Sequence, residues 1–208
     1  MFPHCLIDYL NDEEGFIREA TQLEEEALST IRNNLQNPDL NAECYTFSLR
    51  PITSDISGFL DVLIYVGQTC SNVFHHRDIA HIKFIVDASN QMATHSQNLY
   101  EYIANAINNK QDVFKHIMSK GISKEESEFK EHCVALFLYS STLLQNNQVG
   151  KPTQFSSFAN FKMNDFAKIG CFMIIKQFKE LNFNKSMNFK TELWADFNKS
   201  YLTSQVKS

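Results

Sequence analysis

Several polar side chains stand at spacings that could support chemistry on a phosphate group. Arg77 and His81 are one helical turn apart and therefore fall on one face of a helix. An arginine is charged at every physiological pH, and its planar fork can hold a phosphate through two hydrogen bonds. Farther along the chain, Glu131 offers a carboxylate that can hold Mg²⁺ or Mn²⁺. Such a pair of groups suits the neutralisation of charge that builds up during hydrolysis.

Two tyrosines fall on segments that the sequence predicts to be neighbouring strands. Residues 44–50 alternate in polarity with a period of two and carry Tyr45 on the apolar face, which predicts a half-buried strand. Residues 59–66 are almost continuously apolar, contain Tyr65 and end at Gly67, which predicts a second strand. We expect the two strands to pair in an antiparallel manner. Because strands favour tyrosine, either tyrosine alone could be an ordinary packing residue.

Helical periodicity accounts for most of the remaining chain. The segment Ser123–Glu126 has the Ser-x-x-Glu pattern of a capping box, which predicts that a helix begins there. Further helices are predicted for residues 12–35, 72–88, 95–107 and 165–181, and a short third strand for residues 112–118. The elements together predict an α+β fold in which a small antiparallel sheet is packed with helices.

Composition and charge narrow the classes of partner and compartment. The formal net charge is −5, with acidic residues concentrated between Asp12 and Glu26. Nucleic-acid binding would therefore need a local basic patch rather than a basic surface. Five cysteines without a CxxC pair indicate a reducing compartment. No signal peptide or apolar run long enough to cross a membrane is evident, so we expect a soluble intracellular protein, nuclear or cytoplasmic.

The order of these residues resembles that of the GIY-YIG nuclease family. The stretch Ile64–Thr69, followed by a helix that carries Arg77, is similar to the second half of the family signature, and Cys44–Phe47 stands where the first half would be. Glu131 and the segment Leu143–Asn146 continue the family's order. The long separation of the tyrosines is closest to the animal branch that joins ankyrin repeats and a LEM domain to the nuclease. In this family the two tyrosines, the arginine and the glutamate converge on one phosphate.

The resemblance implies an endonuclease that uses Mg²⁺ or Mn²⁺ to hydrolyse phosphodiester bonds, with DNA preferred over RNA. A tyrosine would position or deprotonate the attacking water, and this needs a nearby cation because the pKa of a free tyrosine is about 10. Asn146 would orient the substrate, and Glu131 would hold the metal. The implied catalytic residues are Tyr45, Tyr65, Arg77, His81, Glu131 and Asn146, and the implied substrate-binding residues are Gly67, Gln68 and Thr69.

The resemblance also implies a division of the chain into three parts. The nuclease-like core would span residues 41–151, between an N-terminal helical extension of residues 1–40 and a C-terminal helical extension of residues 152–208. We expect the terminal helices to pack on the core, or to provide the surface for a homodimer or another protein partner. No membrane partner is expected.

Two other interpretations stay open. A catalytically inactive GIY-YIG-like module that binds nucleic acid or a protein would account for the negative charge and for a first motif without its Gly and Ile. It would also account for Gln68, where many members have Lys or Ser. A helical interaction protein without nuclease ancestry would leave Tyr45, Tyr65 and Glu131 far apart. Cys70 and the nearby His75, His76 and His81 fit no common spacing of zinc ligands.

Overall fold

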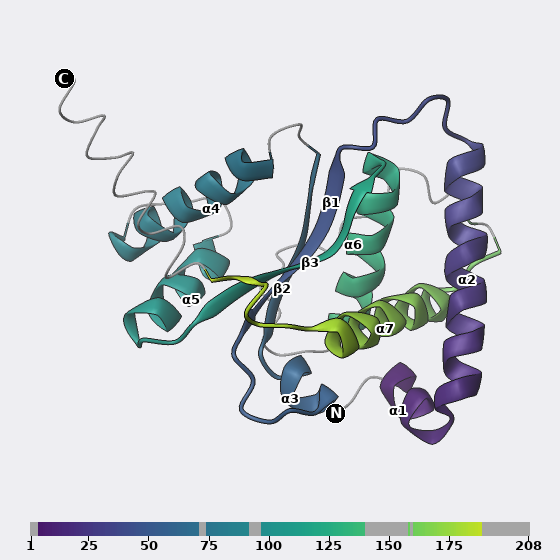
Figure 1. Ribbon diagram of the computed structural model, residues 1–208, viewed down its shortest axis with the longest axis horizontal. Coiled ribbons are helices and arrows are strands. Elements are labelled where there is room, and N and C mark those ends of the chain that lie inside the picture. Colours follow the sequence, from purple (N-terminus) through teal and green to yellow (C-terminus); the bar gives the residue numbers. More distant parts are fainter. Residues whose placement is uncertain (1–3, 71–73, 92–96, 140–157, 159, 189–208) are drawn as a thin grey trace.

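The computed structural model has an α+β fold with a small antiparallel sheet, which is the class that the sequence predicts (Figure 1). It describes residues 4–70, 74–91, 97–139, 158 and 160–188, with side chains in the helix after residue 73 described from Arg77 onward. In chain order the elements are α1 (His4–Asn11), α2 (Glu13–Asn33), β1 (Ala42–Leu49), α3 (Ile56–Leu60), β2 (Leu63–Cys70), α4 (Phe74–Ser89), α5 (Gln97–Asn108), β3 (Val113–Ile122), α6 (Lys124–Leu138), α7 (Met163–Glu180) and β4 (Met187–Asn188).

The strands lie in the order β2-β1-β3-β4, and each neighbouring pair is antiparallel. The expected pairing of the two tyrosine strands is confirmed, with Tyr45 opposite Gly67. The expectation that β1 is half-buried is wrong, because all eight of its residues are buried. A central strand with helices on both faces has no solvent-facing side, so its polar side chains are buried as well.

The second strand begins later than the sequence predicts. Phe59 belongs to the short helix α3, whose start is capped by Asp55, since the Gly58 backbone N–H donates to Asp55 Oδ1 at 2.7 Å. The strand itself runs from Leu63 to Cys70, which places Gly67 within the strand rather than at its end. The apolar run therefore spans the end of a helix and a strand, two elements that a short apolar pattern does not separate.

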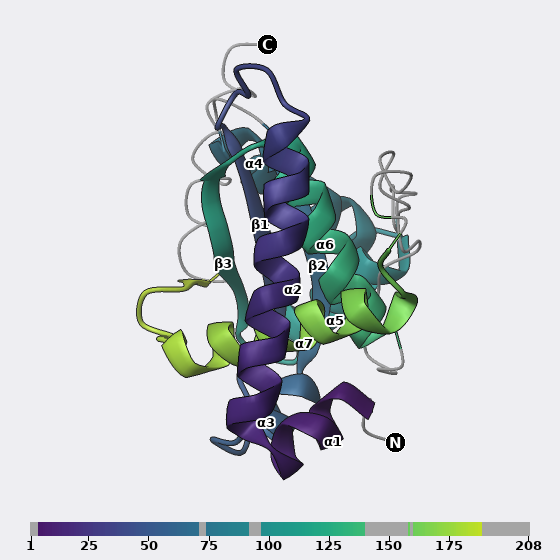
Figure 2. The same cartoon turned by 90° about the vertical axis from the view of Figure 1, so that its right-hand side faces the viewer.

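Helices cover both faces of the sheet in layers. On one face, α4 and α5 pack over Tyr45 and Phe47 (Figure 1). On the other face, α6 and α7 pack over Cys44 and Val66, and α2 lies outside α7 (Figure 2). The sheet thus separates two hydrophobic clusters, and a residue on β1 belongs to one or the other according to its position along the strand.

The terminal helices share the core of the sheet. In α2 the buried residues Phe16, Ala20, Ala27 and Ile31 recur at helical spacing, and the Gly15 backbone N–H donates to Asp12 Oδ1 at the helix start. These residues join the same hydrophobic cluster as β1, α6 and α7. The division into a core of residues 41–151 and two extensions stays a prediction. The described parts of both extensions pack against the core.

Helix α6 begins at the capping box that the sequence predicts. The Glu126 backbone N–H donates to Ser123 Oγ at 3.1 Å, and the Ser123 backbone N–H donates to Glu126 Oε2 at 3.3 Å. The Arg32 Nε atom of α2 also donates to Glu126, at 2.6 Å. The cap fixes where α6 starts and therefore which of its residues face the sheet.

None of the described helices is long and apolar enough to cross a membrane. All five cysteines are free, and Cys70 is the exposed one.

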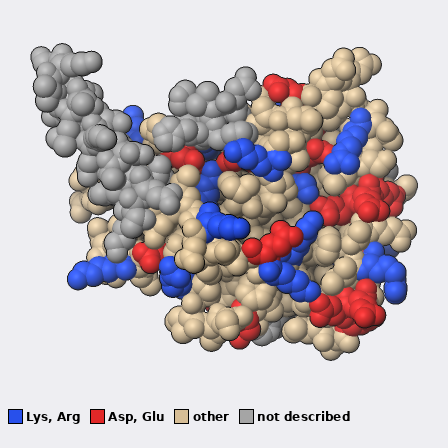
Figure 3. Space-filling view, in the orientation of Figure 1, with Lys and Arg blue, Asp and Glu red and all other residues tan. Residues whose placement is uncertain are grey.

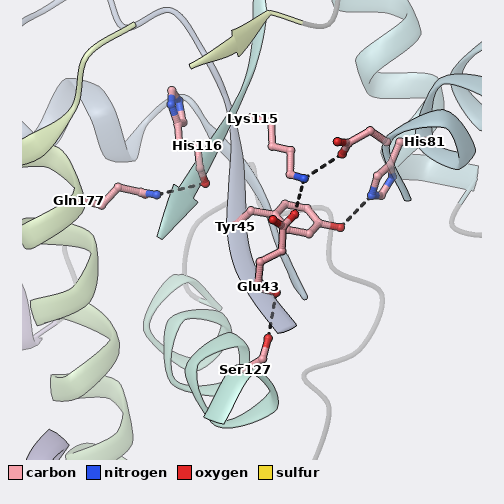
Figure 4. A network of polar contacts seen from close by, with 8 residues as sticks. Glu43, Tyr45, His81, Lys115, His116, Ser127 and Gln177 are labelled. Carbon is pink, nitrogen blue, oxygen red and sulfur yellow. Dashed lines mark hydrogen bonds and ion pairs between the residues drawn. The ribbon is translucent and has the colours of Figure 1, made fainter. Parts of the chain in front are cut away.

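A buried lysine joins three elements on the face of the sheet that carries Tyr45. The Lys115 ammonium on β3 donates to Glu43 Oε1 on β1 at 2.6 Å and to Asp78 Oδ1 on α4 at 2.8 Å, and all three side chains are almost fully buried (Figure 4). The same ammonium lies 4.3 Å from the centre of the Tyr45 ring. Buried charges are costly unless they are paired, so each group in this triad depends on the other two.

We predict that Lys115→Met destabilises the protein by about 3–5 kcal/mol, because it leaves two buried carboxylates without a cation. Denaturant unfolding followed by circular dichroism would measure the loss. The matched control is Lys179→Met, which removes a lysine from a pair with Glu13 whose side chains are 49% and 53% exposed. That control should change the free energy of unfolding by less than about 0.5 kcal/mol. Equal effects of the two substitutions would contradict a structural role for the triad.

Candidate active site

The two tyrosines from β1 and β2 lie side by side on the face of the sheet that α4 and α5 cover. Their ring centroids are 6.3 Å apart, and the Phe47 ring packs against both, with its centroid 5.4 Å from each tyrosine ring. Gly67 stands opposite Tyr45 in the strand register. A Cβ atom at Gly67 would lie 2.5 Å from a ring carbon of Tyr65 and 2.9 Å from the Tyr45 hydroxyl. The absence of a side chain at Gly67 therefore makes room for both rings.

Arg77 of α4 reaches the two tyrosine hydroxyls. Its guanidinium lies close enough to Tyr45 and Tyr65 to lower the pKa of each hydroxyl, because its positive charge favours the ionised form. The Arg77 Nε atom is buried and has no hydrogen-bond partner among the residues that the structure describes. A guanidinium has five donors and no acceptor, so this free N–H is available to an anionic oxygen.

His81, one turn farther along α4, is held at both ring nitrogens. Its Nε2 atom lies 2.8 Å from the Tyr45 hydroxyl, and its Nδ1 atom lies 2.9 Å from the hydroxyl of Tyr100 on α5. Figure 4 shows the contact with Tyr45. Burial lowers the pKa of His81 well below 6.5, and the nearby charges of Arg77 and Lys115 lower it further. The ring is therefore neutral and carries a single N–H.

Burial keeps the tyrosine hydroxyls protonated. It raises the pKa of Tyr45 well above its usual value of 10, with a further contribution from Tyr65, whereas Arg77 acts in the opposite direction. Burial and the charge of Glu131 raise the pKa of Tyr65 as well, again against Arg77. At neutral pH both groups are hydroxyls. Either can give up its proton only if a base receives it and a cation offsets the phenolate charge.

Glu131 of α6 acts on the same group of side chains through its charge. The pKa of the Glu131 carboxyl is raised from 4.5 to about 7, chiefly by burial and also by the charge of Glu128, against the opposite effect of Arg77. A carboxylate in this environment lacks a full complement of counter-charge. A cation beside it would favour the ionised form, since opposite charges lower a carboxyl pKa.

The described residues contain no cluster of three or more His, Cys, Asp or Glu side chains that could hold a metal ion. Mg²⁺ usually keeps several waters and binds through one or two carboxylates together with substrate phosphates, so the single carboxylate of Glu131 fits such an ion. A zinc site has no support. Both ring nitrogens of His81 face tyrosine hydroxyls, the Cys70 thiol donates to Gln68 Oε1 at 3.2 Å, and the side chains of His75 and His76 lie outside the described residues.

The predicted site residues thus fall into three groups. Tyr45, Tyr65, Arg77 and His81 are brought into direct contact, and Glu131 is brought within electrostatic reach of Arg77 and Tyr65. Gln68 and Thr69 lie next to Gly67 on β2, half-buried and buried respectively. Asn146 and the segment around it lie outside the described residues. The wide separation that a helical interaction protein would show is therefore absent for the two tyrosines.

The sequence analysis missed four residues that surround this site, namely Tyr100, Lys115, Glu43 and Asp78. Lys115 follows Val113 and Phe114 in a strand that is otherwise apolar at that end, and a charge in such a run is a signal of a buried pair. Tyr100 lies on the buried face of α5 and gives no local signal, because its partner lies on another helix.

We predict that Gly67→Ala destabilises the protein by about 1–3 kcal/mol, because the added methyl group would overlap both tyrosine rings. Thermal unfolding would measure the effect. In a Tyr65→Ala background the same substitution should cost less, since one of the two rings is gone. An equal cost in both backgrounds would mean that Gly67 does not make room for Tyr65.

The comparisons with known proteins leave the family of this chain as a proposal. No family model, no curated protein sequence and no solved structure matches it.

Proposed function

We propose that this protein is a metal-dependent endonuclease that hydrolyses phosphodiester bonds in DNA through a GIY-YIG-type site. The observation that carries the proposal is the meeting of two tyrosine hydroxyls, Tyr45 from β1 and Tyr65 from β2, at the Arg77 guanidinium from α4. The resemblance to the GIY-YIG family implies this convergence. The three residues come from different elements of the fold. Chance packing of strand aromatics would not place a half-buried arginine at both hydroxyls.

Each side chain has a part in the proposed chemistry. Arg77 binds a non-bridging phosphate oxygen and neutralises the charge that grows on it. Tyr45 takes a proton from the attacking water while its own proton passes to His81 Nε2, 2.8 Å away. The neutral His81 ring is able to receive that proton. Glu131 would hold Mg²⁺ or Mn²⁺, which when bound supplies Lewis-acid neutralisation of the phosphate charge.

The negative charge of the chain is distributed unevenly over the surface. Acidic side chains gather toward the right-hand side of Figure 3, over α2, whose sequence contains six glutamates. Lysine and arginine side chains are spread across the middle of the same view. Helix α2 packs mainly against α7, on the sheet face opposite α4. Since charges on the surface are screened over about 8–10 Å, the acidity of α2 does not by itself prevent a phosphate from approaching Arg77.

We predict cleavage of plasmid or branched DNA in the presence of Mg²⁺ or Mn²⁺. Glu131→Gln and Tyr45→Phe should each lower the cleavage rate by about a hundredfold or more, since Glu131 would hold the metal and Tyr45 takes the proton of the attacking water. The matched control is Glu125→Gln on the same helix, which should keep the wild-type rate. Gel analysis of the products with each metal would measure these rates.

Two results of that assay would overturn the proposal. Equal rates for the wild-type protein and Glu131→Gln would remove the assignment of Glu131. If no metal supports cleavage, and if DNA or protein binding survives Tyr65→Phe, the chain would be the catalytically inactive binding module instead.

The raised pKa of Glu131 predicts that the free energy of unfolding depends on pH. The folded-state pKa of about 7 is higher than the usual value of 4.5, so ionisation of this carboxyl destabilises the fold progressively as pH rises between these two values. Glu131→Gln removes the ionisation. Above about pH 7 the variant should be more stable than the wild-type protein by about 1–3 kcal/mol, and this advantage should disappear toward pH 4.5.

Thermal unfolding across this pH range would test the prediction, with Glu125→Gln as the control that should show no such trend. Mn²⁺ should raise the melting temperature of the wild-type protein and not that of Glu131→Gln, because a ligand stabilises only the state that binds it. A pH-independent difference between the two proteins would contradict the raised pKa. An equal effect of Mn²⁺ on both would contradict metal binding by Glu131.

A further inference from the structure

We propose that Tyr100 is a positioning residue of the candidate active site, which occupies His81 Nδ1 and thereby turns His81 Nε2 toward Tyr45 as a hydrogen-bond acceptor. Its catalytic meaning rests on the proposed nuclease function. The arrangement itself does not, because it follows from the hydrogen bonds around a buried, neutral histidine. Tyr100 comes from α5, an element to which the sequence resemblance assigns no part in catalysis.

The two hydrogen bonds of His81 leave two arrangements to choose between. A neutral imidazole carries one N–H, so one ring nitrogen donates and the other accepts. The contacts are 2.8 Å from Nε2 to the Tyr45 hydroxyl and 2.9 Å from Nδ1 to the Tyr100 hydroxyl. Both hydroxyls belong to almost fully buried residues, which makes an unsatisfied hydrogen in either contact costly.

The surroundings of Tyr45 decide the direction. The Arg77 guanidinium beside the Tyr45 hydroxyl has only donors and a positive charge, so it faces a lone pair of the oxygen and offers no acceptor to the hydroxyl hydrogen. The other charged group beside the ring, the Lys115 ammonium 4.3 Å from its centre, also offers no acceptor. The hydroxyl hydrogen of Tyr45 therefore finds its acceptor at His81 Nε2. The single N–H of His81 then lies on Nδ1 and donates to Tyr100.

The charged and titratable groups that face His81 explain why the ring needs this support. Arg77 on its own helix, Lys115 on β3 and the hydroxyls of Tyr45, Tyr65 and Tyr100 surround it, so two cations face the imidazole. Phe47 packs edge-on against the ring, with the centroids 5.1 Å apart. An imidazolium formed here would be opposed by both cations. The Nδ1–H bond to Tyr100 becomes stronger when the ring is charged and offsets part of that cost.

The proton transfer balances without any further reactant. The O–H bond of Tyr45 breaks as an N–H bond forms at His81 Nε2, and the Tyr45 oxygen receives the proton of the water that attacks phosphorus. His81 then carries a proton on each nitrogen, with Nδ1–H still bound to Tyr100, and the extra proton returns to solvent after the bond is cut. Loss of the Tyr100 hydroxyl should therefore slow the chemical step and leave substrate binding unchanged.

The first test measures the His81 tautomer by long-range ¹H–¹⁵N NMR of the uniformly labelled protein, with His81→Gln used to assign its signals. We expect one tautomer in the wild-type protein, with the hydrogen on Nδ1. Tyr100→Phe should convert it to a mixture or to the Nε2–H form. Tyr102→Phe is the matched control, because Tyr102 is a half-buried tyrosine on the same helix and both His81 nitrogens already face other hydroxyls. The control should keep the wild-type tautomer.

The second test measures DNA cleavage with Mn²⁺. Tyr100→Phe should lower kcat by roughly tenfold with KM unchanged, whereas Tyr102→Phe should leave both constants as in the wild-type protein. A wild-type tautomer with the hydrogen on Nε2 overturns the inference even if Tyr100→Phe does not fold. Unchanged tautomer and kcat in Tyr100→Phe overturn it while the nuclease proposal stands. A wild-type protein that cleaves no DNA overturns the nuclease proposal. The measured tautomer of His81 then tests only the proposed hydrogen bonds to Tyr45 and Tyr100.

Discussion

The arrangement of this protein depends on one constraint, the complete burial of the central strand β1. Four of its residues carry polar side chains that are removed from water, and each must find a partner to offset the loss of hydration. On one face Glu43 pairs with Lys115, and Tyr45 contacts His81. On the other face Thr46 donates to Gln177 of α7, and Ser48 contacts His116 of β3. These pairs fix the helices and the neighbouring strand against the sheet in one register.

The same constraint produces two buried histidines with different surroundings. His116 is held between the hydroxyls of Ser48 and Ser186 at 2.7 Å each, and burial lowers its pKa to about 4. His81 is held between two tyrosines on the opposite face of the sheet. Of these two histidines, His81 is the one with an arginine beside the hydroxyl that it contacts, and for this reason the proposed proton transfer is assigned to it. The difference lies in the neighbours, since the hydrogen-bond pattern of the two rings is the same.

The charged side chains around Tyr45 differ in how far the fold pairs them with opposite charges. Lys115 satisfies two buried carboxylates and so keeps their negative charge from acting on the tyrosine unopposed. The Arg77 Nε–H is buried and has no hydrogen-bond partner among the described residues, and burial raises the pKa of Glu131 to about 7. Groups of this kind are common at sites that bind a ligand, because the ligand completes the pairing. The triad thus serves the fold, while Arg77 and Glu131 are the groups to which the proposed function assigns a substrate and a metal.

Local patterns in the sequence determined much of the secondary structure. The helical spacing in α2, the Ser-x-x-Glu cap of α6 and the period-two pattern of β1 are short-range signals, and the structure confirms each element. The order of Tyr45, Tyr65, Arg77, His81 and Glu131 along the chain is also a property of the sequence, and the predicted site rests on it. The start of β2 was predicted wrongly, because the end of α3 and the strand form one continuous apolar run.

Only the tertiary structure decided what surrounds those residues. The second face of β1 is covered by helices that lie more than seventy residues away in the chain, so local periodicity could not show that the strand is fully buried. Tyr100 and Lys115 join the site through hydrogen bonds across 19 and 37 residues, to His81 and Asp78 respectively. Such partners are selected by the packing of whole elements. The sequence therefore determined which chemical groups are present and in what order. The packing of helices on the sheet decided which of them form hydrogen bonds and ion pairs with one another.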